Sequence, residues 1–299
     1  MARQQGWFAI ILALAIASGS VLFSFSLELG LDLRGGSQLT LEVQPTEDIQ
    51  IIQSEQLEAV KSVLDRRVNG LGVSESTLQT VGSNQLVLEL PGEQDPSRAA
   101  KVLGETALLE FRSQLPGTED KMSNLKRIRS QIKALIEYTK KNNSINNDES
   151  DDFEIDINQF PTLQKELGIK LTSSNTIDQY NEILDDVNSQ IVSLFEPAYL
   201  TGKDLITAGS QPEVNSSGWE VTLAFNKDGS DKFARLTQSI AGTGRLLGIV
   251  LDGYSISEAS VGSQFKVAGI TGGSATISGN FSAESARDLE VQLRGGSLP

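Results

Sequence analysis

Cysteine and histidine are both absent from this chain of 299 residues. Without cysteine there can be no disulfide framework and no thiolate metal site. Without histidine the chain lacks the side chain that most often acts as a general base, binds zinc or activates a serine nucleophile. A Gly-x-Ser-x-Gly nucleophile elbow is missing as well, which disfavours an anchored hydrolase. We therefore expect a protein that is not an enzyme, with no catalytic residue, no cofactor and no metal site.

Positive charge is also scarce. The chain has 25 basic and 39 acidic residues, which give a formal net charge of −14 at pH 7. An acidic surface repels the phosphates of nucleic acids, whose binding needs clustered lysine and arginine. The one basic cluster, residues 126–129, precedes an acidic stretch at 141–156 and fits the solvated face of a helix. We expect no nucleic-acid partner, and the acidic stretch is predicted to be a solvated linker rather than a calcium loop.

One long apolar run is present near the N-terminus. Residues 7–27 carry no charge, and these 21 residues would form a helix about 31 Å long, close to the roughly 30 Å of a bilayer core. The alternative is a cleaved signal peptide, but the run is longer than the apolar region of such peptides. Arg3 precedes the run, so the positive-inside bias places the N-terminus in the cytoplasm. We expect a membrane anchor followed by an exported domain.

The pattern after this anchor predicts an α+β fold. Alternating apolar residues predict strands, and apolar residues three or four apart predict helices. The first part reads strand, helix, strand, strand, helix, strand, the order of the ferredoxin-like motif. These elements are expected at 38–43, 54–69, 77–81, 85–90, 95–103 and 106–112.

A second α/β pattern follows a mainly helical insertion. Helices are expected at 122–141 and 177–194, and the second half is expected to contain strands at 219–225, 246–251, 254–261 and 275–278 with helices at 228–240 and 282–293. The predicted organisation is a transmembrane anchor (1–28), the first half of a ferredoxin-like base (29–112), an inserted helical head (113–218) and the second half of the base (219–299). Hinges are expected at 112–117 and 200–219, where the chain crosses between the base and the inserted head.

Three other stretches could be functional motifs, but a purely structural explanation also fits each of them. The glycines of 242–248 follow a helix and precede a strand, so they predict a turn rather than a phosphate loop. The glycines of 269–275 fit either a close approach between backbones or a hinge. Asp65, Arg66 and Arg67 fit the solvent-exposed side of a helix.

A short sequence, LRGGS, occurs at 33–37 and again at 293–297. The first copy belongs to GLDLRGG, directly after the apolar run, and this segment resembles a signature of the SecD family of protein-export membrane subunits. Similar blocks follow in the family order over most of 1–112 and 196–299. The residues that carry the resemblance are Asp32, Arg34, Gly35, Gly36, Asn69, Gly72, Pro91, Gly92, Leu200, Thr201, Gly202, Asp252, Gly253, Gly273, Gly279, Arg294, Gly295, Gly296 and Pro299. Glu258 and Ala259 depart from the usual Ala-Pro, and residues 113–195 match no block of the family.

The resemblance implies a role in protein export. SecD-family proteins work with SecF and the SecYEG channel and promote late polypeptide translocation with the proton gradient. The implied location is the bacterial inner membrane, with the N-terminus cytoplasmic and the main domain periplasmic, and the implied contacts are unfolded exported polypeptides and membrane lipid. These motif residues are then structural or hinge residues. The family's proton-carrying carboxylate belongs to a later membrane span, so we expect further apolar runs to be encoded beyond Pro299. The alternative is a membrane-anchored extracytoplasmic binding or scaffold protein, which needs no further span.

Overall fold

The computed structural model describes residues 7, 12, 14, 16, 18, 35–45, 52–73, 76–145, 177–214 and 217–298. Most of the predicted anchor, Asp32, Arg34, Pro299 and the acidic residues 146–156 lie outside the described residues. Among the described residues, no helix combines the length and the hydropathy of a membrane span. The chain folds into two compact units, residues 1–57 with 72–100, and residues 58–71 with 101–299.

The first unit contains a three-stranded antiparallel sheet. Its order is β1 (Gly36–Glu42), β3 (Gln85–Pro91) and β2 (Thr77–Val81). The central strand β3 alternates buried and partly buried residues, and its leucines Leu86, Leu88 and Leu90 are fully buried. This is the period of two that a strand with one covered face requires. Helices α3 (Ser54–Leu71) and α4 (Pro96–Gly104) begin in this unit and end in the second.

The predicted order of elements in the first half is confirmed, but the predicted ferredoxin-like sheet is wrong in its last strand. Strand β4 (Leu109–Ser113) belongs to the second unit, where it pairs with β5 (Leu200–Thr201) and β8 (Leu246–Leu251). Leu109 and Phe111 are both fully buried in the core of that unit. Their burial explains why β4 forms part of the second sheet rather than closing the first.

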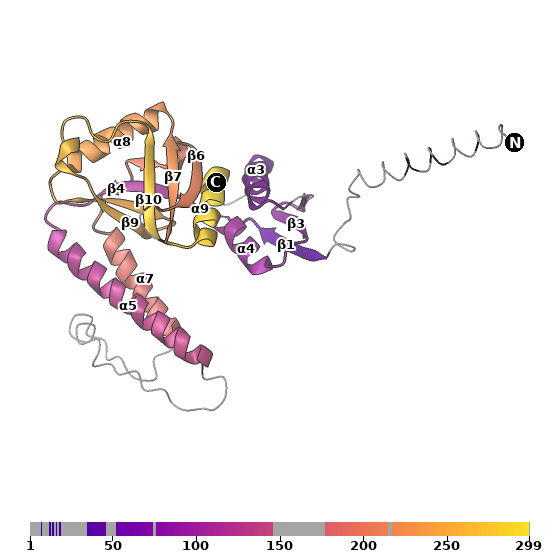
Figure 1. Ribbon diagram of the computed structural model, residues 1–299, viewed down its shortest axis with the longest axis horizontal. Coiled ribbons are helices and arrows are strands. Elements are labelled where there is room, and N and C mark those ends of the chain that lie inside the picture. The colour runs from indigo at the N-terminus through magenta and orange to yellow at the C-terminus, as the bar shows by residue number, and fades with distance from the viewer. Residues whose placement is uncertain are drawn as a thin grey trace. The chain divides into compact units, whose positions relative to one another are not determined.

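The second unit contains two further antiparallel sheets. One has the order β5-β4-β8-β9, with β9 at Tyr254–Ser260, and the other has the order β10 (Ser274–Phe281), β7 (Trp219–Phe225), β6 (Leu205–Pro212). Helices α8 (Lys227–Ile240) and α9 (Ala283–Gly295) follow β7 and β10, as Figure 1 shows. The short helices η2 (Gly202–Asp204) and η3 (Ser263–Phe265) lie between β5 and β6 and between β9 and β10.

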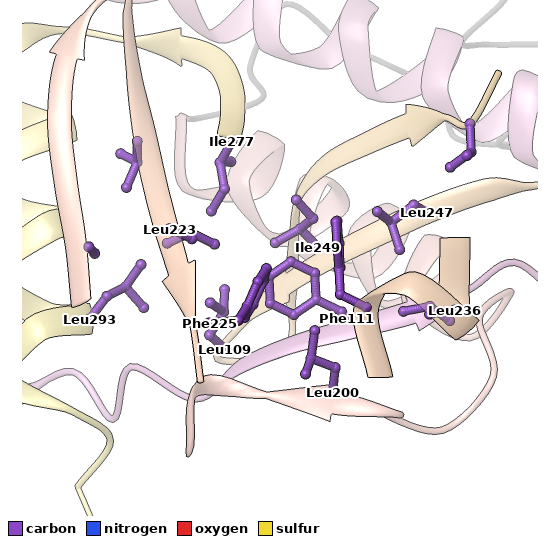
Figure 2. Close-up of a cluster of buried hydrophobic side chains, with 14 of the residues drawn as sticks. Leu109, Phe111, Leu200, Leu223, Phe225, Leu236, Leu247, Ile249, Ile277 and Leu293 are labelled. Carbon is purple, nitrogen blue, oxygen red and sulfur yellow. The ribbon is translucent and has the colours of Figure 1, made fainter. Parts of the chain in front are cut away.

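Both sheets and both of these helices share one apolar core. Phe111, Phe225 and Phe233 form its aromatic centre, with ring centroids 5.0–5.9 Å apart. Edge-to-face and offset contacts at such distances are favourable for aromatic pairs. Figure 2 shows Leu109 and Phe111 of β4 directed toward the side chains of β7 and β8.

The expected helices of the insertion form a hairpin with a separate core. Helix α5 (Glu119–Ile145) and helix α7 (Ile177–Val192) pack along each other (Figure 1). Their stripes of apolar residues face one another, as the three- and four-residue spacing predicts. The buried residues of this second cluster are Met122, Leu125, Ile128, Ile132, Leu135, Ile136, Tyr180, Val187, Ile191, Leu194 and Phe195.

Two segments of the predicted helical head form strands. Residues 200–201 and 205–212, expected inside a mainly helical head, form β5 and β6 and pair with β4 and β7. The burial of β6 alternates poorly, which explains why no strand was predicted from its sequence.

The predicted turn at 242–248 is confirmed at its start, because Gly242 and Gly244 have φ of 64° and 84° between α8 and β8. The fold is therefore mixed α/β, while the anchor and the base and head boundaries stay predictions.

Candidate functional site

Arg67 lies near the C-terminal end of α3 and is completely buried, with 0 % of its surface exposed. The expectation of a solvent-exposed cluster is correct for Asp65 and Arg66, which are exposed, and wrong for Arg67. The reason is the helical period: Arg67 follows Leu64 by three positions and Val60 by seven, so it lies on the buried face with them.

The guanidinium of Arg67 binds backbone carbonyls from two distant parts of the chain. Its acceptors are the carbonyl oxygens of Val102 (3.2 Å), Leu103 (2.9 Å), Glu105, Thr106 (3.3 Å) and Gly296 (2.9 Å). Because α4 ends at Gly104, several of these are carbonyls that the end of a helix leaves unpaired. One side chain therefore ties the ends of α3, α4 and α9 together, and we call Arg67 with these five partners the Arg67 junction.

The junction holds a buried positive charge. Burial lowers the pKa of Arg67 to about 10, while the nearby charges of Asp252 and Glu105 oppose this shift. The group therefore stays protonated at neutral pH. Its Nε atom has no hydrogen-bond partner among the described residues. A buried charge of this kind is costly once its partners are removed, so the junction depends on its carbonyl ligands.

Asp252 and Gly253 fasten the start of β4 beside this junction. Asp252 has φ of 50° and Gly253 has φ of 80°, the left-handed conformations that a tight hairpin turn requires between β8 and β9. The carboxylate of Asp252 accepts hydrogen bonds from the amides of Ala107 (2.9 Å) and Leu108 (2.7 Å) and from the hydroxyl of Thr106. Ala107 has φ of 54°, which is rare for a residue with a side chain. Asp252 thus stabilises an unusual backbone where β4 begins.

The second LRGGS copy supplies the other side of the junction. A Cβ atom on Gly295 would lie 2.4 Å from Cγ of Arg67, so only glycine fits there. Gly296 has φ of 86°, and its amide donates to the carbonyl of Gln292 (3.1 Å). Gln292 in turn donates to the carboxylate of Glu105 at 2.6 Å. The two glycines therefore allow α9 to end directly against Arg67.

The first LRGGS copy has a different setting, in the first unit. Gly36 pairs with Pro91 across β1 and β3, and the amide of Gly92 donates to the carbonyl of Gly35 at 2.9 Å. The structure thus brings together four predicted residues in each unit: Gly35, Gly36, Pro91 and Gly92 in the first, and Asp252, Gly253, Gly295 and Gly296 in the second.

The remaining predicted residues are distributed over the fold. Asn69 is exposed on α3, and Gly72 (φ 78°) ends that helix. Arg294 forms an ion pair with Glu290 at 3.1 Å. The carbonyl of Gly273 accepts from the amide of Phe225 (2.7 Å).

The Leu200-Thr201-Gly202 block surrounds the start of η2. Leu200 is buried in the core, and the amide of Thr201 donates to the carboxylate of Asp204 (3.1 Å). A Cβ on Gly202 would lie 3.6 Å from Leu109, and one on Gly279 would lie 3.0 Å from the ring of Phe281. In the Arg67 junction, only Gly296 was predicted as a site residue; Arg67, Val102, Leu103, Glu105 and Thr106 were not. For Arg67 the signal was present, because its helical spacing from Leu64 and Val60 placed it on the buried stripe.

A second polar site joins the α5–α7 hairpin to β9. Arg129 of α5 forms two parallel hydrogen bonds with the carboxylate of Glu258, both 2.8 Å long, and Lys126 lies 3.5 Å from the same carboxylate. Burial alone would raise the pKa of Glu258, but hydrogen bonds from Arg129 and Ser255, with the charges of Arg129 and Lys126, hold it below its ordinary value. The basic cluster that sequence reasoning assigned to a solvated face thus supplies two partners of a buried carboxylate.

Further polar contacts accompany Glu258. The hydroxyl of Tyr254 donates to the carboxylate of Asp185 (2.6 Å), and the amide of Ser255 donates to the side chain of Asn188 (3.3 Å). We call Glu258 with Lys126, Arg129 and these two contacts the hairpin interface. Among the described residues, no three carboxylates or other metal-binding groups cluster together.

Comparison with known proteins explains why these motifs occur in this order. The family profile described as "SecD/SecF GG Motif" matches residues 21–47, "Protein translocase subunit SecDF, P1 domain, N-terminal" matches 57–116, and "SecDF, P1 head subdomain" matches 178–299. The SecD translocase subunit of Prochlorococcus marinus is 62 % identical over all 299 residues of this chain, which cover 60 % of that protein. The chain belongs to the SecD family.

Other SecD relatives agree with this assignment. The SecD subunit of Synechocystis is 42 % identical over the whole chain, which covers 58 % of it. A solved SecDF structure, described as "a membrane component SecDF that enhances protein export", has a TM-score of 0.56 and 26 % identity, with 88 % of this chain and 95 % of that chain covered. The chain therefore spans about three fifths of the length of these two SecD relatives.

The Arg67 junction and the hairpin interface differ in how far they overlap the ranges that the family profiles match. Every residue of the Arg67 junction falls within the matched ranges 57–116 and 178–299. In the hairpin interface, Glu258 falls within a matched range, whereas Lys126 and Arg129 lie between the matched ranges. The Arg67 junction thus consists of residues from family-matched segments, and the hairpin interface joins such a segment to residues outside them.

Proposed function

We propose that this chain is part of a membrane subunit of the Sec protein-export machinery. The observation that carries the proposal is the identity of 62 % to a SecD translocase subunit over the entire chain. In this role it assists late translocation of unfolded polypeptides with SecF and the SecYEG channel, using the proton gradient, and catalyses no reaction of its own. The main domain lies on the periplasmic side of the inner membrane, with the N-terminal anchor in the lipid.

Two separate hydrophobic cores support a moving part within the second unit. The sheets with α8 and α9 share one cluster of buried residues, and the α5–α7 hairpin has another. The hairpin interface between them includes a charged pair and two side-chain hydrogen bonds. Polar contacts can be exchanged for contacts with water, so such an interface opens at lower cost than an apolar one.

The hairpin connects to the sheets through two short segments. Residues 114–118 lead from β4 into α5, and residues 193–199 lead from α7 to β5. The amide of Leu115 donates to the carbonyl of Leu194 (2.8 Å), so the two segments run together. We place the hinge there: the first segment overlaps the predicted hinge at 112–117, and the second replaces the one at 200–219, where the chain forms strands.

Capture of an emerging polypeptide by a hairpin that has two positions would bias the movement of that polypeptide. Binding can shift a two-position equilibrium only if the affinity differs between the positions. The proposal therefore requires the hairpin in its position against β9 to bind exported chain differently from the released hairpin.

Complementation tests the export role. The complete protein that contains this chain is expressed in cells depleted of their own SecD, and the processing of exported precursors is followed by pulse-chase labelling. We expect precursor processing to return toward the undepleted rate. A fully expressed, membrane-inserted protein that leaves precursors unprocessed would argue for the anchored scaffold alternative.

A further inference from the structure

A cavity of about 360 Å³ lies between the α5–α7 hairpin and strands β9 and β10. Its lining residues are Arg129 and Lys133 of α5, Leu184 and Asn188 of α7, Tyr254, Ser255 and Ile256 of β9, and Gly279 and Phe281 of β10. Ligand pockets start at about this size, and a cavity of this volume accommodates one or two side chains rather than a folded partner.

One side of the cavity is apolar. Leu184, Ile256 and Phe281 are each partly buried, and Tyr254 is 47 % exposed at its edge. Gly279 leaves room beside Phe281, because a Cβ there would come within 3.0 Å of the ring. An aromatic or aliphatic side chain that entered here would be removed from water against these residues.

The other side carries positive charge. Arg129 and Lys133 line the cavity; Glu258, beside it, pairs with Arg129 and Lys126, and Lys133 forms no ion pair with any carboxylate in the described part of the chain. Burial and the charge of Arg129 lower the pKa of Lys133. Asp185 binds the hydroxyl of Tyr254 at the edge, so three cations in and beside the cavity outnumber two carboxylates in a protein whose net charge is −14. A local positive field of this kind attracts anions.

Asn188 supplies adaptable polar atoms at the floor. It donates to the carbonyl of Gly253 at 3.4 Å and accepts from the amide of Ser255 at 3.3 Å, and both bonds are long for protein hydrogen bonds. Its amide can therefore turn toward a bound polar group at small cost.

We infer that this cavity binds a segment of exported polypeptide in which a carboxylate side chain neighbours an aromatic or aliphatic one. The carboxylate pairs with Lys133, and the apolar neighbour packs against Phe281 and Ile256. The inference rests on the proposed export function and adds a substrate preference to it. Because the cavity is lined by both the hairpin and the sheets, occupancy would also differ between the two hairpin positions.

A peptide titration tests this inference. The probes are the capped tripeptides Phe-Glu-Phe and Phe-Gln-Phe, which differ only in charge. Each is titrated into the full chain while the amide resonances of Tyr254, Ile256 and Phe281 are followed by NMR. We expect the Glu peptide to shift these resonances and to bind about fivefold more tightly than the Gln peptide, the effect of one partly exposed ion pair.

Lys133→Met, which keeps an unbranched apolar side chain, should abolish the preference for the Glu peptide. Lys121→Met removes the same charge from an exposed position of α5 outside the cavity lining, and the preference should remain. Equal affinities of the two peptides for the unmodified chain would overturn the inference, as would equal effects of the two substitutions. Binding of anionic lipid vesicles at these residues without peptide binding would also overturn it. None of these results depends on export in cells, so the proposed function can fail or hold independently.

Discussion

Gly295→Ala tests whether the Arg67 junction is as tightly packed as its geometry indicates. The added Cβ would lie 2.4 Å from Cγ, 3.3 Å from Nε and 3.4 Å from Cδ of Arg67. Carbon atoms prefer separations of about 3.5–4.0 Å, so one of the two residues must move by about 1 Å. Arg67 cannot retreat easily, because its guanidinium is held by five carbonyls.

The expected cost follows from two opposing effects. Overpacking of this kind destabilises a fold by about 1–3 kcal/mol. Replacing glycine by alanine within a helix stabilises the fold by about 0.5–1 kcal/mol, because alanine loses less backbone entropy on folding. We therefore expect Gly295→Ala to lower the free energy of unfolding of the second unit by about 1–2 kcal/mol.

Urea unfolding followed by the fluorescence of Trp219 measures this quantity, because Trp219 packs against the core of the second unit. Gly104→Ala is the matched control: Gly104 also ends a helix, and a Cβ there would have no neighbour within 4 Å. The control should be neutral or slightly stabilising. If Gly295→Ala proves no more destabilising than Gly104→Ala, the tight packing of Arg67 is refuted.

The remaining predictions concern Glu258. Glu258→Gln should lower the free energy of unfolding by about 1–3 kcal/mol at neutral pH, because Arg129 and Lys126 lose a charged partner. Since the pKa of Glu258 in the folded chain lies below its ordinary value, its stabilising contribution is present above the unfolded-state pKa and disappears as pH falls through the folded-state pKa. The stability difference between the two proteins, measured by urea unfolding at several pH values, should therefore shrink toward acid pH. A difference that is constant or grows toward acid pH would contradict this assignment.

Local sequence patterns predicted most elements of this fold correctly. The helices at 177–194 and 228–240 and the strands at 219–225 and 246–251 agree with α7, α8, β7 and β8 within a few residues. In α7, α8 and β7 one face is buried at the regular period of the backbone, whereas β8 is a short apolar run buried at all four of its central positions. Both patterns can be recognised from composition and spacing.

The elements that were misjudged depend on distant contacts. Strand β4 was recognised as a strand, but only the burial of Phe111 among residues from β7 and α8 decides which sheet it joins. Strand β6 alternates poorly: it lies at the edge of its sheet, and its register with β7 shifts between Leu205 and Thr207. Pairings between residues so far apart in sequence leave little trace in either segment alone.

The sequence identified several residues of the candidate site, but it did not indicate that they lie close together. Glycines and turn residues such as Asp252, Gly295 and Gly296 stood out as motifs, because their backbone geometry restricts the residue type. Arg67 was assigned to the solvated side of its helix because charged helix residues are usually solvated, although its spacing placed it on the buried face. The sequence marked Glu258 only as a departure from the family pattern. Its role in joining β9 to α5 follows from the two hydrogen bonds that Arg129 donates to it.

Cross-linking the hairpin to β9 tests the proposed movement most directly. The sequence contains no cysteine, so Asp185→Cys and Tyr254→Cys in the complete protein would introduce the only thiols within these 299 residues, at two exposed positions in contact. A short bis-maleimide then joins α7 to β9. Asp186→Cys with Gln190→Cys, joined in the same way, is a control confined to α7, since those side chains already contact each other at 2.9 Å. Our account predicts that the α7–β9 link slows precursor export at an unchanged protein level while the control link does not. Normal export with a fully cross-linked α7–β9 pair would contradict it.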